Sequence, residues 1–234
     1  MNRTVGILGG MGPMATCDLF RKIVECEDVA TDQEHVRVCI DSNTEIADRT
    51  AAILCGGSDP LPEMIRSAVR LEGMGADVLI MPCNTAHYFY DTLVKYVKVP
   101  FLHMPGETAA RIADKGIKTV GLLATDGTIQ SGVYSKAFEK RNIDVLVPET
   151  DEQKEVMGLI YDGVKAGRTD YDTARFIEVV NNLLGRGAEV LVLGCTELPV
   201  AYDMWNFDFP AVDPTLVLAE RAVEFVRKGG NEIK

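Results

Sequence analysis

Short apolar runs alternate with longer amphipathic segments along the whole chain. The short runs are rich in valine, isoleucine and leucine and predict strands at residues 4–8, 36–40, 78–81, 101–104, 119–123, 144–147, 190–193 and 211–213. The longer segments predict helices at residues 15–25, 62–74, 86–97, 107–115, 132–141, 152–166, 174–186 and 214–228. Strands that are apolar throughout and alternate with helices are typical of parallel sheets covered on both faces. The pattern therefore predicts an α/β fold.

The apolar pattern is also duplicated. Residues 75–85 and 187–197 share a Gly-Ala-acidic start, an apolar run and then a cysteine followed by small polar residues, which places Cys83 and Cys195 112 positions apart. Two further pairs of segments recur in the same order at offsets of 115 and 110, residues 5–8 with 120–123 and 99–103 with 209–213. The repeat predicts two pseudo-symmetric α/β domains with parallel sheets. We place the first at residues 1–105 plus 214–234 and the second at 106–213.

Polar loops follow the equivalent strands of the two predicted domains. Because ligands of α/β sheets bind beyond the carboxyl ends of the strands, residues 9–13, 83–85, 125–128 and 195–197 are expected to meet in one cleft between the domains. Two thiols on opposite sides of a cleft suit a proton transfer that uses two bases and no cofactor. Cys83 opens a predicted helix, whose N-terminus lowers the pKa of a thiol, and we expect both thiols to be readily oxidised.

Composition narrows the function classes. With 24 basic and 35 acidic residues the net charge is −11, which argues against nucleic acid or an anionic membrane as a partner. We find no signal-peptide pattern and no apolar run long enough to span a bilayer, so we expect a cytoplasmic protein. The six cysteines lack the Cys-x-x-Cys spacing of metal sites or redox motifs, and we predict no metal. An anionic substrate needs local cations, for which Arg49 and Lys165 are candidates, although from the residues alone a solvated surface charge is the better interpretation of each.

Other interpretations also fit parts of the sequence. Residues 10–15 match the G-x-G-x-x-A pattern of dinucleotide sites, with Asp41 as a possible ribose acceptor, but Pro13 removes an N–H from the loop. The same loop could instead bind a carboxylate through Met11 and Gly12. His87 lies one helical turn after Cys83 and could make a Cys–His pair. The alternative that is not an enzyme is a nucleotide- or amino-acid-binding regulator with inert thiols.

Five motifs together resemble the aspartate/glutamate racemase family, most closely its cofactor-independent aspartate racemases. These motifs are residues 9–16, 43–50, 82–87, 163–167 and 194–198. The resemblance implies two pseudo-symmetric domains with the active site between them, no cofactor and a homodimer. It also implies that Cys83 and Cys195 are the acid/base groups and that Arg49 and Lys165 bind substrate carboxylates. Some relatives carry threonine in place of one cysteine and are selective for one enantiomer, so two cysteines favour reversible racemisation.

The resulting hypothesis is a racemase that interconverts L- and D-aspartate without a pyridoxal cofactor, with glutamate left open as a further substrate. One thiolate removes the α-proton while the other thiol returns a proton to the opposite face. Hydrogen-bond donors stabilise the developing charge. The predicted substrate-binding residues are Met11, Gly12, Arg49, Asn84, Thr85, Thr125, Lys165, Thr196 and Glu197. A related cysteine-dependent enzyme of maleate isomerase, arylmalonate decarboxylase or hydantoin racemase type is the alternative within the same fold.

Overall fold

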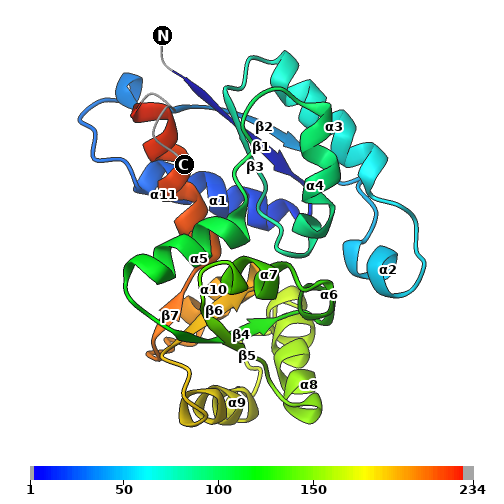
Figure 1. The fold of residues 1–234 in the computed structure, drawn as a ribbon, viewed down its shortest axis with the longest axis vertical. Helices are drawn as coiled ribbons and strands as arrows, with labels where there is room; N and C mark the ends of the chain where they lie inside the picture. Colours follow the sequence, from blue (N-terminus) through cyan, green and yellow to red (C-terminus); the bar gives the residue numbers. More distant parts are fainter. Residues whose placement is uncertain (1–2, 229–234) are drawn as a thin grey trace. The chain divides into compact units, whose positions relative to one another are not determined.

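The computed structural model describes residues 3–228 and divides into two compact units. Unit 1 is drawn from Met1–Glu107 and Thr215–Lys234, and unit 2 is Thr108–Pro214. These bounds differ by one or two residues from the domains expected from the sequence. Each unit is an α/β structure built on a parallel sheet (Figure 1).

Unit 1 contains a three-stranded sheet with the order β2-β1-β3. Its strands are β1 (Thr4–Gly9), β2 (Arg37–Ser42) and β3 (Val78–Ile80). Alternate side chains of the strands enter two separate apolar clusters. Leu8 and Leu79 pack with α3 (Leu61–Gly73), whereas Val5 and Ile7 pack with α1 (Pro13–Glu25) and α11 (Pro214–Arg227). Both faces of the sheet are thus buried, as the continuous apolar runs predict.

Shorter elements of unit 1 lie in the segments that connect these strands and helices. They are η1 (Asp32–Glu34), α2 (Arg49–Leu54), η2 (Thr85–Phe89), α4 (Tyr90–Leu93) and η3 (Val94–Tyr96). The chain then enters α5 (Met104–Asp114), which leads into unit 2.

Unit 2 repeats this arrangement with one more strand. Its sheet has the order β5-β4-β6-β7, with β4 (Thr119–Ala124), β5 (Asp144–Leu146), β6 (Val190–Gly194) and β7 (Ala211–Val212). The helices are α6 (Asp126–Ser131), α7 (Val133–Glu139), α8 (Thr150–Gly158), the π-helix η4 (Leu159–Lys165), α9 (Ala174–Gly185) and α10 (Glu197–Met204). Leu123, Leu191 and Leu193 share one buried cluster with side chains of α8 and α9.

The duplication extends to individual contacts. A Cβ atom on Gly6 in β1 would come within 2.6 Å of Leu79 Cδ2, and one on Gly121 in β4 within 2.4 Å of Leu191 Cδ2. Leu79 and Leu191 are 112 positions apart, which is the offset of the two cysteines. Each glycine therefore lets the first strand of its unit lie close to the third, and the cysteines follow those third strands.

Several predicted elements differ in the structure. Residues 101–104 do not form a strand, because Phe101 makes a single bridge to Leu79 and His103 Nδ1 accepts a hydrogen bond from the Gly106 N–H at the start of α5. The predicted helix at 86–97 is split into η2, α4 and η3, and the helix predicted at 152–166 continues beyond Gly158 as the π-helix η4. Helices α2, α6 and α10 were not predicted. Within residues 3–228 there is no helix both long enough and apolar enough to cross a bilayer.

Candidate active site

Both cysteines lie at the same topological position. In each sheet the first strand is flanked by the second on one side and the third on the other, so the chain changes direction between the first and third strands. Ligands of open α/β sheets bind at the carboxyl end of such a switch point. Cys83 follows β3 beside the loop that leaves β1, and Cys195 follows β6 beside the loop that leaves β4. Each unit therefore presents one buried thiol at the position where its fold is expected to bind a ligand.

The glycine-rich loop after β1 is held by its own chain. Gly10 has φ +90°, and a Cβ atom there would come within 2.3 Å of the Asn43 backbone. The Gly10 N–H donates to Thr16 Oγ1 at 2.9 Å, and Thr16 Oγ1 donates to the Gly12 carbonyl oxygen at 3.1 Å. Met11 is buried in the apolar cluster that contains Cys83, whereas the position of a Cβ on Gly12 has no atom within 4 Å. Gly12 is thus the open point of the loop.

These contacts weaken the dinucleotide interpretation. That fingerprint uses free N–H groups on the loop and a free carboxylate at the end of the second strand. Here the Gly10 N–H already bonds Thr16, and the Asp41 carboxylate pairs with Arg70 at 2.7 Å. The two groups that the fingerprint needs are engaged in structural contacts.

Arg49 is positioned as a cation without an acidic partner. It is the first residue of α2, which Asp48 caps by accepting from the Ala51 N–H at 2.6 Å. Its guanidinium donates to the carbonyl oxygens of Ala47 at 3.0 Å and Met11 at 3.1 Å, with a longer contact to Ile46. The buried Nε has no hydrogen-bond partner, and within residues 3–228 Arg49 pairs with no carboxylate. A guanidinium held by carbonyl groups and not by a carboxylate can bind an anion.

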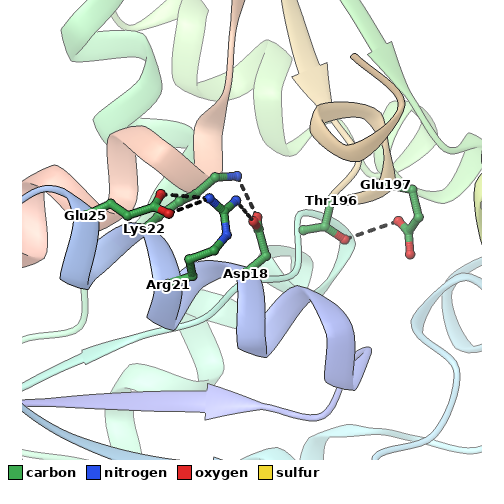
Figure 2. A network of polar contacts seen from close by, with 6 residues as sticks. All are labelled: Asp18, Arg21, Lys22, Glu25, Thr196 and Glu197. Carbon is green, nitrogen blue, oxygen red and sulfur yellow. Dashed lines mark hydrogen bonds and ion pairs between the residues drawn. The ribbon is translucent and has the colours of Figure 1, made fainter. Parts of the chain in front are cut away.

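The cations of the neighbouring helix α1 contrast with Arg49. Arg21 pairs with Asp18 at 2.6 Å and with Glu25 at 2.7 Å, and Lys22 lies 2.5 Å from Asp18 (Figure 2). These charges are neutralised on the helix surface and do not mark an anion site.

Cys83 is held by a buried histidine that is not its base. His87 Nδ1 lies 2.8 Å from the Cys83 carbonyl oxygen, and His87 Nε2 accepts a hydrogen bond from the Met104 N–H at 3.2 Å. Burial, with a smaller contribution from His103, lowers the pKa of His87 to about 3. The ring is therefore neutral, with its proton on Nδ1, and both nitrogens bond the backbone. This arrangement contradicts a Cys–His catalytic pair and gives His87 the role of fixing the loop that carries Cys83.

The two residues after Cys83 are buried beside it, but they do not begin the α-helix predicted from the sequence. Asn84 and Thr85 are buried, and they open η2, a 3-10 helix of five residues, in place of the longer α-helix expected. Helix α2 packs against η2, so the segment carrying Arg49 lies beside the one that follows Cys83.

Cys195 forms a cluster with an acid and a lysine. The Cys195 Sγ donates to Glu197 Oε2 at 2.9 Å, and Thr196 Oγ1 donates to the same oxygen at 3.2 Å (Figure 2). Lys165 Nζ lies 3.8 Å from the other carboxylate oxygen, Oε1. Burial, followed by the charge of Glu197 and the hydrogen bond to it, raises the pKa of the Cys195 thiol well above its ordinary value.

The raised pKa corrects the expectation of two thiols with low pKa. Glu197 lies two residues after Cys195, and its negative charge outweighs Lys165, which lowers the pKa of the thiol by a smaller amount. Cys195 is consequently a protonated thiol at neutral pH, and it is not the easily oxidised thiolate predicted from the sequence.

The remaining predicted ligands of unit 2 have structural partners of their own. Thr125 caps α6, with its Oγ1 accepting from the Thr128 N–H at 3.3 Å. Lys165 ends η4, and its Nζ lies 4.2 Å from the centre of the Tyr161 ring. Gln153 was not among the predicted site residues, and its Nε2 donates to the Ala124 carbonyl oxygen at the end of β4. Residues 153, 157, 161 and 165 recur every four positions, a spacing that could have indicated this shared helix face.

The fold and its paired strand-end thiols define the protein as a racemase-type α/β enzyme, and comparison with known proteins places it more narrowly. It belongs to the Asp/Glu/hydantoin racemase family, whose model matches residues 8–222. It is therefore an isomerase of the amino-acid racemase class.

Individual relatives match over nearly the whole chain. The aspartate racemase of Picrophilus torridus is 32% identical with a TM-score of 0.83, covering 96% of this chain and 94% of that one. The broad specificity amino-acid racemase RacX of Bacillus subtilis is 27% identical over 225 residues, covering 94% of this chain and 96% of the relative. A glutamate racemase of Francisella tularensis, solved with D-glutamate, is 18% identical with a TM-score of 0.71 and shares the fold.

Proposed function

We propose that this racemase interconverts L- and D-aspartate by proton transfer at the α-carbon, with Cys83 and Cys195 as the acid/base groups. One cysteine, as a thiolate, accepts the α-proton, and the other, as a thiol, donates a proton to the opposite face of the planar intermediate. The proposal invokes no cofactor. It requires that both thiols reach one α-carbon.

The single observation that carries the proposal is the repeated placement of the two buried thiols. Each follows the third strand of its sheet at the switch point, and each is the first polar side chain after a fully buried strand. A buried structural cysteine would account for one such residue, but it gives no reason for the same placement 112 positions later. The 32% identity to an aspartate racemase supports the same assignment.

The protonation of Cys195 fits one half of the reaction. A resting thiol with a raised pKa is a proton donor, so the substrate enantiomer whose α-proton faces Cys83 can react without a prior proton shift. After transfer Cys195 carries the negative charge beside Glu197. Lys165, at 3.8 Å from Glu197, offsets part of the repulsion between the two anions.

The cations provide the binding energy that a dianionic substrate needs. In a chain of net charge −11, a carboxylate binds where a local cation is available, and Arg49 is held by carbonyl groups and pairs with no acid in the described part of the chain. We propose that Arg49 and Lys165 each bind a substrate carboxylate. Binding at such remote groups orients the α-carbon for reaction.

The developing negative charge on the α-carboxylate needs hydrogen-bond donors. Asn84, Thr85 and Thr196 are buried and follow the two cysteines by one or two positions, and we propose that they supply these donors. Thr125 follows the end of β4, where Ala124 pairs with Gly194 of β6, but it already caps α6, so its contribution would come from its remaining hydrogen-bonding capacity.

Substrate range is tested with a panel of L- and D-amino acids in deuterated water. Aspartate should gain α-deuterium in both enantiomers and reach the racemic mixture. Glutamate is the second candidate, because a glutamate racemase of Desulforudis audaxviator is 28% identical over 181 residues. Exchange confined to a substrate without a second carboxylate would exclude the acidic amino acids, and no α-deuterium in either enantiomer of aspartate would contradict the proposal.

A further inference from the structure

A groove on unit 2 lies beside the helix that carries Lys165. It has a volume of about 670 Å³, which lies within the range of small-molecule sites. The walls come from α6, the segment after β5, α8 and η4. Its lining includes Asp126, Ile129, Gln153, Met157, Tyr161 and Asp162.

One residue that lines the groove, Gln153, has a hydrogen-bond acceptor that is buried beneath the surface without a donor. Gln153 Nε2 donates to the Ala124 carbonyl oxygen at 2.9 Å and to Asp126 Oδ1 at 2.8 Å. Both partners are acceptors, so the amide cannot be turned round without placing its oxygen against two other oxygens. The orientation is therefore fixed, and Gln153 Oε1 is buried with no partner within residues 3–228. A buried acceptor left in this way is stabilised by a ligand that brings an N–H.

The charges at the groove favour a cationic ligand. Asp126 and Asp162 line it, and neither pairs with a cation among residues 3–228. The one basic side chain in the lining, Lys154, is already paired with Asp151 at 2.6 Å. The walls between these acids are apolar or aromatic, from Ile129, Met157 and Tyr161.

We propose that this groove is a second ligand site, which binds a primary ammonium or guanidinium group carried on an apolar stem. The N–H groups of such a ligand satisfy Gln153 Oε1 and the carboxylates of Asp126 and Asp162. Its stem lies against Ile129, Met157 and the ring of Tyr161.

The site is linked to the catalytic cluster through one side chain. Tyr161 lines the groove and also lies under Lys165 Nζ, at 4.2 Å from the ring centre, and Lys165 in turn contacts Glu197. A ligand that holds Tyr161 would therefore change how Lys165 binds an acidic substrate. This link rests on the proposed function, whereas the binding of an amine does not.

The test is a calorimetric titration of the protein with pentylammonium. Pentanoate and pentan-1-ol, which carry a similar alkyl chain with a negative or a neutral head group, are the control ligands. We expect saturable binding of pentylammonium with a dissociation constant of about 1 mM, and none of the other two. Met157→Lys, which places a competing cation in the groove, should abolish binding. Asp162→Asn should weaken it about tenfold, and Asp208→Asn, an exposed acid elsewhere on unit 2, should leave it unchanged.

Each other result overturns the site. The binding signal would come from another site or from general charge attraction in any of three cases. These are equal binding of pentanoate, equal weakening by Asp208→Asn, and unchanged affinity in Met157→Lys. No binding at about twenty times the expected constant would exclude the site outright. Because binding is read without turnover, it should persist in Cys195→Ala, so a failed racemase assay and a failed amine site are distinguishable. The link to Lys165 is contradicted if saturating pentylammonium leaves the KM for L-aspartate unchanged.

Discussion

Cys195 Sγ donates a hydrogen bond to Glu197 Oε2 over 2.9 Å, two residues further along the chain. This contact keeps the proton on sulfur, because a thiolate at the same place would lie against a carboxylate in a buried site. It assigns Cys195 the thiol role in the resting enzyme. The contact also makes the proton affinity of Cys195 adjustable through one neighbouring residue.

Replacement of Glu197 by glutamine should move the alkaline limb of the kcat/KM profile to lower pH. Glu197 raises the pKa of Cys195 by its charge and its hydrogen bond, so removal of the charge lowers that pKa and the thiol is lost earlier as the pH rises. The measurement is a pH–rate profile for L-aspartate, compared with Glu178→Gln, which alters an exposed pair with Arg175. An unmoved alkaline limb in Glu197→Gln would show that Cys195 does not set it.

Arg49→Lys should raise the KM for aspartate at least tenfold, which corresponds to about 1.4 kcal/mol. Lysine keeps the charge but loses the planar fork that bonds the Ala47 and Met11 carbonyl oxygens while facing an anion. Arg21→Lys is the matched control, because Arg21 lies on α1 in exposed ion pairs. If both variants shift KM by the same factor, Arg49 contributes no specific contact to the substrate.

Burial of neutral His87 should make the folded protein less stable to unfolding as the pH falls. Its pKa is lowered from 6.5 to about 3 in the folded protein, so the unfolded chain binds the proton more readily. The stability that His87 contributes is present above pH 6.5 and is lost as the pH falls towards 3, at up to about 1.4 kcal/mol per pH unit. Urea unfolding between pH 7.5 and pH 4 measures the loss.

The matched variant for this prediction is His87→Gln. At pH 7.5 it should be less stable than the wild type by about 1–3 kcal/mol, because glutamine cannot keep both backbone bonds of the ring. The gap between the two proteins should shrink as the pH falls. A gap that stays constant down to pH 4 would mean that His87 is not held neutral by burial.

Two glycines in one loop give a paired test of the backbone. Gly10→Ala should destabilise the protein by about 3 kcal/mol or more, because the residue has φ +90° and its Cβ would meet the Asn43 backbone. Gly12→Ala should cost less than about 1 kcal/mol, since the position of its Cβ is open. Thermal unfolding of the two variants measures the difference, and similar losses would contradict the packing of Gly10 against Asn43.

The sheets could be predicted from the sequence because their strands are apolar on both faces. The strands β1, β3 and β6 are buried along their whole length, and β4 is buried except at its first residue, Thr119. Burial on both faces requires a continuous apolar run, which is easy to recognise in the sequence. The same apolar runs predict that Cys83 and Cys195 each follow a buried strand. The offset of 112 also joins Gly6 to its contact Leu79 and Gly121 to Leu191, although the repeat itself has low identity.

Short helices and side-chain networks could not be predicted in this way. Helix α2 has six residues, which is too short for the apolar spacing of a helix to repeat. Its start depends on the Asp48 side chain, which accepts a hydrogen bond from the Ala51 N–H. Residues 101–104 look like a strand, but His103 bonds Gly106 and turns the chain into α5. The pKa of Cys195 depends on the orientation of Glu197 and on burial, neither of which appears in a local sequence pattern.

The most direct test of the two-thiol mechanism measures α-deuterium incorporation and racemisation of L- and D-aspartate in deuterated water, for the wild type, Cys83→Ala and Cys195→Ala. The wild type should convert either enantiomer to the racemate, with deuterium at the α-carbon of the product. Each variant should lose at least about a thousandfold in racemisation rate while its melting temperature stays close to that of the wild type. If either variant racemises aspartate at the wild-type rate, that cysteine is not an acid/base group and the two-thiol mechanism is wrong.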